Sequence, residues 1–127
     1  MPANRKIYSY VEQDGSAPVL TFISHLDCKT QKKVWAQLVQ LKDPLFHFQP
    51  PIIKAFRQSR DKGLYELRTR IRQSVRVIFT LDADGSIVLL HGFIKNSDCA
   101  TERALEIARA RRLALASALQ MQMLYPI

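Results

Sequence analysis

The chain has 127 residues, of which 47% are hydrophobic, and a formal net charge of +8. That length supplies one hydrophobic core, so we expect a single domain over residues 1–127. There is no run of 18 apolar residues, and the basic N-terminus has no apolar stretch behind it, which argues against a membrane span and a secretory signal. We therefore expect a cytoplasmic protein with no membrane partner.

The two cysteines, Cys28 and Cys99, are far apart in the sequence and have no Cys or His near them at the spacing of a metal site. This pattern supports neither a disulfide framework nor a metal centre. We expect both thiols to be reduced and buried, because a free cysteine usually packs as a small apolar side chain. No metal and no cofactor is expected.

The first part of the chain predicts one strand and two helices. Residues 6–12 are rich in strand-forming side chains and precede an Asp-Gly turn. Apolar residues then recur at helical spacing over residues 19–26 and 31–41, which predicts a helical hairpin broken near residues 27–30. The second helix should end before Pro44, since proline disfavours helix in the residue that precedes it.

The second part of the chain predicts a sheet and a long helix. Residues 45–62 have no clear period and are expected to be extended backbone and loop. Three strands are predicted after them, over residues 64–72, 75–81 and 87–93. The middle strand is almost wholly apolar, as central strands are. Residues 101–124 lack Gly and Pro and are rich in helix formers, which predicts a long C-terminal helix that could break near Ser117.

Positive charge is concentrated in one segment, residues 54–76. Its acidic residues are Asp61 and Glu66, and its eight basic residues give it a net charge of +6: Lys54, Arg57, Arg60, Lys62, Arg68, Arg70, Arg72 and Arg76. This segment therefore accounts for most of the charge of the chain. A surface of this kind attracts polyanions.

The end of the basic segment alternates between apolar and charged residues. The alternation predicts a strand with one face on the core and one exposed face, which carries a carboxylate followed by three guanidiniums: Glu66, Arg68, Arg70 and Arg72. A charged edge strand that discourages aggregation is the alternative interpretation. Lysine is the usual residue for that purpose, so three arginines favour phosphate binding.

Two turns decide which other side chains share the charged face. A three-residue loop over residues 73–75 would pair Arg72 with Arg76 and place Arg76 beside the charged row. The Asp-Gly pair at residues 84–85 favours a two-residue loop. That loop would add His91 and Lys95 to the charged face through three pairs: Thr80 with Leu89, Ile78 with His91, and Arg76 with Phe93. A longer loop over residues 82–86 could reverse the parity and remove His91.

Such a face could cleave RNA without a metal, by attack of the 2′-hydroxyl on the adjacent phosphorus. The reaction needs a base, cationic donors around the phosphoryl oxygens and an acid for the leaving 5′-oxygen. Glu66 is the candidate base, Arg68 and Arg76 would hold the phosphate through paired hydrogen bonds, and His91 or Lys95 would deliver or relay the proton. Five of the remaining cations would bind the RNA backbone: Lys54, Arg57, Arg60, Arg70 and Arg72. DNA lacks the 2′-hydroxyl and would be spared.

Each of these residues also has a purely structural explanation. Glu66 among arginines could be a surface ion pair, and His91 could be an ordinary strand residue. Three aromatic residues are interpreted as core or a hydrophobic loop, although they could stack on a base: Trp35, Phe46 and Phe48. Three arginines near the end of the chain could form a solvated helix face: Arg109, Arg111 and Arg112.

Four short motifs follow one another over the second half of the chain. They are GLYELR at residues 63–68, VRVIF at 75–79, IVLLHGFIK at 87–95 and EIAR at 106–109. In order and spacing they resemble the RelE/HigB-like toxins of bacterial type II toxin–antitoxin systems, and within them most closely the phage-derived HigB-like branch.

The resemblance implies a RelE-like α+β fold, with a mainly antiparallel sheet, an N-terminal helical hairpin and a C-terminal helix. It also implies an mRNA endonuclease that commonly cuts messages on the ribosome. The motif positions carried over are Glu66, Arg68, Arg76 and Lys95. The implied partner is a cognate antitoxin with a helix-turn-helix segment.

The chain departs from the motif at two places. Asn96 replaces a second lysine, and Ala100-Thr101 replaces the Thr-Pro that often opens the last helix. The apolar tail after residue 113 is not explained by the motif and could dock on the sheet or bind a partner. The alternative function is a non-catalytic, phage-derived module that binds nucleic acid or another protein.

Overall fold

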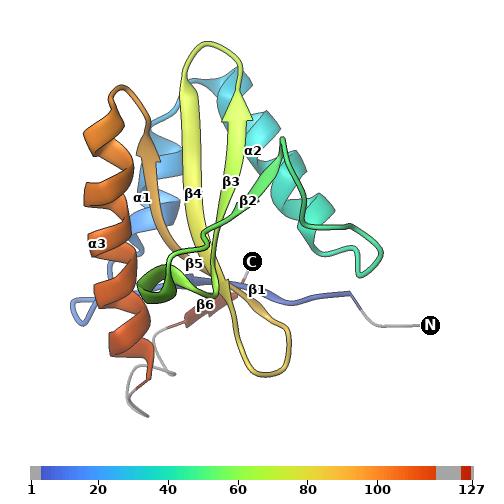
Figure 1. Cartoon of the computed structure of the whole chain (residues 1–127). Coiled ribbons are helices and arrows are strands. Elements are labelled where there is room, and N and C mark those ends of the chain that lie inside the picture. The colour runs from blue at the N-terminus through green and yellow to red at the C-terminus, as the bar shows by residue number, and fades with distance from the viewer. Residues whose placement is uncertain (1–3, 117–123, 127) are drawn as a thin grey trace.

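The computed structural model describes residues 4–116 and 124–126. Over these ranges it shows an α+β fold in which helices cover both faces of a six-stranded sheet (Figure 1). In chain order the strands are β1 (Ile7–Tyr10), β2 (Ile53–Ala55), β3 (Leu64–Arg70), β4 (Ser74–Leu81), β5 (Ile87–Ile94) and β6 (Leu124–Pro126). The helices are α1 (Pro18–Ser24), α2 (Cys28–Leu41) and α3 (Asp98–Leu115), with a short 3₁₀ helix, η1 (Ser59–Asp61).

The sheet is mainly antiparallel, so the predicted fold class is confirmed. Its strand order is β2-β3-β4-β5-β1-β6, and in the described part of the chain β1 and β5 are the parallel pair. β2, β3, β4 and β5 form a continuous antiparallel unit. The predicted charged face therefore lies on β3, β4 and β5, which are the longest strands of the sheet.

The predicted helical hairpin is confirmed, but its break lies earlier than expected. α2 begins at Cys28, and Asp27 before it accepts a hydrogen bond from Thr30 Oγ1 at 2.5 Å. The break therefore covers residues 25–27, because this side-chain contact belongs to the first helical turn. α2 ends at Leu41, as the proline that follows predicts.

The predicted C-terminal helix forms, but its expected extent to residue 124 is wrong. The helix ends at Leu115, and Leu124–Pro126 pair with β1 as β6. A free strand edge presents unpaired backbone groups, and pairing with the end of the chain satisfies them. Helical propensity cannot reveal this long-range contact. The expected break near Ser117 lies outside the described residues.

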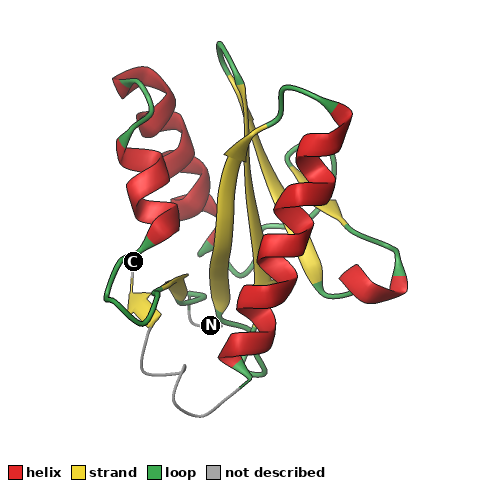
Figure 2. Ribbon diagram, turned by 90° about the vertical axis from the view of Figure 1, so that its left-hand side faces the viewer, coloured by secondary structure: helices red, strands yellow, loops and turns green. Residues whose placement is uncertain are grey.

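Two hydrophobic layers lie on opposite faces of the sheet. Helices cover the sheet on both sides (Figure 2). α1 and α2 cover the layer that contains Leu67, Val77 and Phe79. α3 covers the other layer, where Leu105 packs with Ile78. The three aromatic residues interpreted as core pack against the first layer: Trp35, Phe46 and Phe48.

The β3–β4 register differs from the predicted one, although its parity is correct. The predicted pair of Arg72 with Arg76 is wrong, because Arg76 is opposite Arg68. The loop covers residues 71–73, and it still has an odd number of residues. Arg76 therefore remains on the face of Glu66 and Arg68. Arg72 lies in the turn and is not part of the row.

The β4–β5 hairpin reaches the predicted faces by a different route. Its loop covers residues 82–86, so the expected two-residue loop is wrong. A bulge between Ile78 and Phe79 compensates for the change in parity. Two of the three predicted pairs are confirmed, Ile78 with His91 and Arg76 with Phe93. The third is wrong, because Thr80 is opposite Val88 instead of Leu89.

The three arginines near the end of α3 are structural, so their interpretation as a solvated face is wrong. Arg109 pairs with buried Asp61 at 2.5 Å. The other two donate to backbone carbonyl oxygens: Arg111 to Leu90 at 2.6 Å, and Arg112 to Lys62 at 2.7 Å. These contacts hold α3 against β5 and against the segment around η1.

Both cysteines are exposed, so the expectation that they are buried is wrong. Cys28 and Cys99 each lie in the first turn of a helix, outside the stripe of residues that the helix buries. Within the part of the chain described here, none of the helices has the length and apolarity needed to span a membrane.

Candidate functional site

Two arginines and one glutamate meet at the centre of the antiparallel unit. Arg68 on β3 and Arg76 on β4 are directly opposite each other. Glu66 Oε1 accepts a hydrogen bond from Arg68 Nε and another from Arg76 Nη1, each at 3.0 Å. We call these three residues the Arg-Glu-Arg cluster.

The carboxylate of the cluster is buried beneath its two partners. The side chain of Glu66 is 2% exposed, against 31% for Arg68 and 15% for Arg76. The interpretation of Glu66 as a surface ion pair is therefore wrong with respect to its burial. Charge-assisted hydrogen bonds to one carboxylate oxygen hold two guanidiniums close together, although they repel each other. The cluster keeps a net charge of +1.

The second carboxylate oxygen of Glu66 is also buried, and it has no hydrogen-bond partner among the described residues. Such an unpaired buried acceptor is uncommon in folded proteins. Lys54 lies opposite Glu66 on the neighbouring strand, but its ammonium lies over the ring of Phe56, 5.4 Å from the ring centroid. Basic residues of three neighbouring strands, β2, β3 and β4, therefore lie next to Glu66 in the sheet, although the Lys54 ammonium is turned to Phe56.

The guanidiniums have donors to spare, because each arginine carries five N–H groups. On one side of the cluster they face a small polar hollow of about 400 Å³, to which α2 and the β3–β4 hairpin contribute. Its charged and hydrogen-bonding residues include Lys33, Gln37, Arg68, Arg70, Ser74 and Arg76. An anion could enter this hollow and accept hydrogen bonds from both arginines of the cluster.

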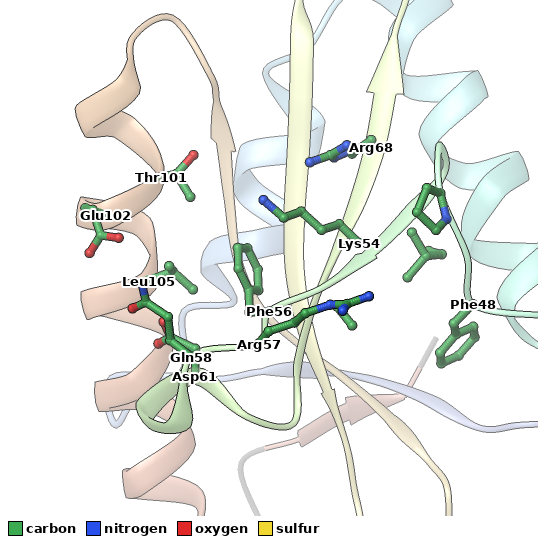
Figure 3. Close-up of a pocket in the computed structure, with 13 residues that line it drawn as sticks. Phe48, Lys54, Phe56, Arg57, Gln58, Asp61, Arg68, Thr101, Glu102 and Leu105 are labelled. Atoms are coloured by element: carbon green, nitrogen blue, oxygen red, sulfur yellow. The ribbon is translucent and has the colours of Figure 1, made fainter.

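A larger pocket of about 680 Å³, which Arg68 also lines, lies between β2 and α3 (Figure 3). Lys54 and Arg68 extend from neighbouring strands in the same direction, toward α3 (Figure 3). The lining also includes Phe56, Arg57, Gln58, Asp61, Thr101, Glu102 and Leu105. Arg68 lines both hollows, so one guanidinium borders the two cavities.

His91 lies on the predicted face but not in the cluster. Ile78 separates it from Glu66 in the strand order, and its ring stacks on Phe93 at 5.9 Å between centroids. Its Nδ1 lies 3.3 Å from Arg111 Nη1. Burial, and then the charge of Arg111, lower the pKa of His91 from 6.5 to about 4. The imidazole is therefore neutral at physiological pH.

Lys95 follows β5 and is anchored near the rim of the small hollow. Its backbone N–H donates to the carbonyl oxygen of Ser74 at 2.8 Å. Ser74 is opposite Arg70, so Lys95 continues the row that these two residues form across the sheet. It lies one row beyond the pair of Arg68 and Arg76.

The five predicted RNA-binding residues are divided among four places. Lys54 and Arg57 line the larger pocket, and Arg70 lines the small hollow. Arg60 forms an exposed ion pair with Glu102 at 3.1 Å. Arg72 is close enough to Asp27 that its charge helps, after the hydrogen bond from Thr30, to lower the pKa of that carboxyl. The structure therefore does not bring the five cations together.

Sequence reasoning missed the larger pocket and the ion pair that shapes it. Asp61 is 2% exposed and holds η1 against α3 through Arg109. The two residues are 48 positions apart, so no local period joins them. The available signals were an acid inside a basic segment and an arginine in the last motif.

The comparisons with known proteins identify a family. No curated protein matches the chain. The sequence model of the family described as "Phage derived protein Gp49-like (DUF891)" matches residues 21–113, which include both arginines and the glutamate of the cluster. That span exceeds half of the chain and contains all four short motifs. The chain belongs to this phage-derived Gp49-like family, which is a family of RelE/HigB-like toxins.

Proposed function

We propose that this protein is an mRNA endonuclease, the toxin of a type II toxin–antitoxin system of the HigB-like branch. The observation that supports the proposal most directly is the Arg-Glu-Arg cluster, in which Arg68 and Arg76 are held side by side at 3.0 Å from one carboxylate oxygen. Two guanidiniums at this spacing can hold one phosphodiester from two directions. Family membership supports a toxin role.

The proposed reaction needs no metal. The 2′-oxygen of the RNA attacks the adjacent phosphorus, and the bond between that phosphorus and the 5′-oxygen breaks. The products are a 2′,3′-cyclic phosphate and a 5′-hydroxyl. Negative charge increases on the phosphoryl oxygens in the transition state. Preorganised donors aimed at that charge are usually the largest contribution to such catalysis. Arg68 and Arg76 supply them.

The burial of Glu66 changes the role that we assign to it. Its Oε1 is occupied by both arginines, and its Oε2 is covered, so a 2′-hydroxyl could reach it only if an arginine moved. Glu66 is therefore better suited to position the guanidiniums than to act as the base. We assign the 2′-proton to solvent water.

The proton for the leaving 5′-oxygen is assigned to Lys95. His91 is a poor source, because its pKa of about 4 leaves it neutral and its Nδ1 faces the donor of Arg111. Lys95 is partly exposed and lies at the end of the row formed by Arg70 and Ser74. Its ammonium can donate a proton and has three N–H groups with which to do so.

The proposal includes the protein's partners and location. A cognate antitoxin with a helix-turn-helix segment would cover the basic face, and the message would be cut on the ribosome in the cytoplasm. The basic segment supports this, since a concentrated positive charge attracts both RNA and an acidic partner.

The test is cleavage of mRNA by variants of the cluster. Arg76→Ala should lower the cleavage rate by about a hundredfold or more, because one preorganised donor is removed. Mapping of 5′-hydroxyl ends in cells that express the protein alone measures this loss. Arg103→Ala removes an exposed arginine of α3 that lines neither hollow and should cleave normally. Full growth arrest by the Arg76 variant would contradict the assignment.

The second candidate function is a non-catalytic module that binds nucleic acid. The observation in its favour is that the carboxylate and the imidazole on this face are both engaged, Glu66 by two arginines and His91 by Arg111. Such a module would bind RNA with an affinity that falls steeply with salt concentration. It would release no cleavage products, which distinguishes it from the nuclease.

A further inference from the structure

We propose that the larger pocket binds one nucleobase of the RNA whose phosphate contacts Arg68 and Arg76. The inference depends on the proposed function and adds the residues that select the base. Its starting point is that Arg68 lines both the small hollow and the larger pocket. A nucleotide whose phosphate contacts this guanidinium in the small hollow could therefore reach the larger pocket with its base.

The dimensions of the pocket suit such a ligand. Its volume of about 680 Å³ lies within the range of roughly 300–1,000 Å³ that is typical of small-molecule sites. It lies between β2 and α3 and is partly open to solvent, so an unpaired base can enter it. A base in single-stranded RNA is free to turn out of the stack in this way.

Apolar and aromatic side chains provide a face for the base. Phe56 and Leu105 line the pocket from opposite elements, a loop after β2 and the helix α3. The Phe56 ring is only partly buried. Stacking of a base on such a ring tolerates every base, because all have a π face.

The charge of the pocket also favours a nucleotide. Its two carboxylates are both engaged with arginines outside the lining: Asp61 with Arg109 at 2.5 Å, and Glu102 with Arg60 at 3.1 Å. Lys54, Arg57 and Arg68 are also part of the lining and supply positive charge. The pocket is therefore electropositive where the sugar and phosphate of a bound nucleotide would lie.

Two polar side chains are placed to distinguish one base from another. Thr101 lines the pocket, and its Oγ1 is buried without a hydrogen-bond partner among the described residues. A buried hydroxyl without a partner costs free energy, which a ligand could recover by hydrogen bonding to it. Gln58 lines the same pocket and offers both an amide donor and a carbonyl acceptor. We assign recognition of the base edge to these two residues.

The test measures binding, so that it does not depend on cleavage. Short RNA oligonucleotides carry a 2′-O-methyl group at every nucleotide, which prevents cleavage. Within one series the oligonucleotides differ at a single position, which carries adenine, cytosine, guanine, uracil or no base. Further series place this variable position elsewhere along the oligonucleotide. The dissociation constant of each is measured for the wild type, Phe56→Leu, Thr101→Val and Gln58→Ala. Thr21→Val and Gln40→Ala are the matched controls, as exposed helical positions outside both pockets.

At one position the wild type should bind the preferred base about tenfold more tightly than the abasic residue. Phe56→Leu should reduce this ratio for all four bases. Thr101→Val and Gln58→Ala should reduce the differences among the bases and leave abasic binding unchanged. Equal affinity of the wild type for every oligonucleotide would overturn the proposal. It would also be overturned if Thr101→Val and Gln58→Ala discriminated among the bases as strongly as their control variants.

The outcome is separate from that of the proposed function. If the wild type cleaves no message but binds the preferred base more tightly than the abasic residue, the nuclease is contradicted and the base pocket is supported. If it cleaves but shows no ratio, the opposite holds. Phe56 is partly buried, so a variant that fails to fold would be recognised by circular dichroism. The exposed Gln58 then decides the question together with Thr101.

Discussion

At the scale of single residues, the burial of Glu66 is the feature with the largest consequence. Arg68 and Arg76 face each other across two strands, and like charges directly opposite each other destabilise a sheet. The carboxylate of Glu66, which is 2% exposed, offsets this repulsion by pairing with both arginines. The residue thus stabilises the fold and sets the geometry of the candidate site at the same time.

This arrangement predicts a clear order among two variants of Glu66. Glu66→Ala should lower the free energy of unfolding by about 3 kcal/mol, because it leaves two partly buried guanidiniums without a counter-charge. Glu66→Gln keeps an acceptor oxygen and should lose about half as much. Urea denaturation measures both, with the exposed Glu106→Gln as the control.

Cleavage assays on the same two variants separate the possible roles of Glu66. If it positions the arginines, Glu66→Gln should retain much more activity than Glu66→Ala. If it is the base, the two variants should be equally inactive. Equal loss of activity would therefore contradict the positioning role that we propose.

His91 predicts a pH dependence of stability. Its pKa in the folded protein is about 4, below the usual 6.5, so the unfolded chain takes up a proton first as the pH falls. The stability that the neutral imidazole contributes is fully present above pH 6.5 and is lost progressively between pH 6.5 and about 4. His91→Gln should remove this dependence.

The measurement is the unfolding free energy of wild type and His91→Gln at several pH values. Both proteins carry the same carboxylates, so the difference between the curves isolates the histidine. The exposed His47→Gln serves as the control and should follow the wild type. Parallel curves for the wild type and the His91 variant would show that the imidazole is not held neutral.

At the scale of elements, α3 is fastened to the segment around η1 by a buried ion pair. Arg109 and Asp61 lie 2.5 Å apart, and the side chain of Asp61 is 3% exposed. Arg112 adds hydrogen bonds to the carbonyl oxygens of Lys62 and Arg60. These contacts bring together the two sides of the larger pocket, which belong to different parts of the chain.

This fastening predicts a large effect of Arg109→Ala. The variant leaves Asp61 buried without its partner, so the unfolding free energy should fall by about 3 kcal/mol. Asp61→Asn combined with Arg109→Ala should be less destabilising than the sum of the single changes, because the two residues are coupled. Thermal or urea unfolding checks both statements, and Arg103→Ala should cost less than about 0.5 kcal/mol. Additive losses would contradict the coupling.

At the scale of the whole molecule, the two faces of the sheet differ in how completely helices cover them. One face is closed by α1 and α2 over a continuous apolar layer. The other is covered by α3 over part of its area, and the rest carries the Arg-Glu-Arg cluster and the larger pocket, while the small hollow also takes residues from α2. The cations that line the two hollows therefore lie on a supported and partly open surface, where a polyanion could approach them.

Local pattern predicted the helices, the three long strands and the side of the sheet that carries charge. Period and propensity act over a few residues, so they can be read before the chain is folded. The odd length of the first turn is enough to place Arg76 on the face of Arg68, whichever residues form the loop. The family resemblance pointed to the same charged residues.

The sequence by itself thus determined the three helices, the strands β1, β3, β4 and β5, and the fact that a carboxylate and two guanidiniums share one face. Only the tertiary structure decided that the longer β4–β5 loop is offset by a bulge, that Glu66 is buried beneath its partners, and that β6 pairs with β1. It also created the larger pocket, whose sides come from β2 and α3. These features depend on contacts between residues that are distant in the chain, and such contacts form only when packing and burial are satisfied together.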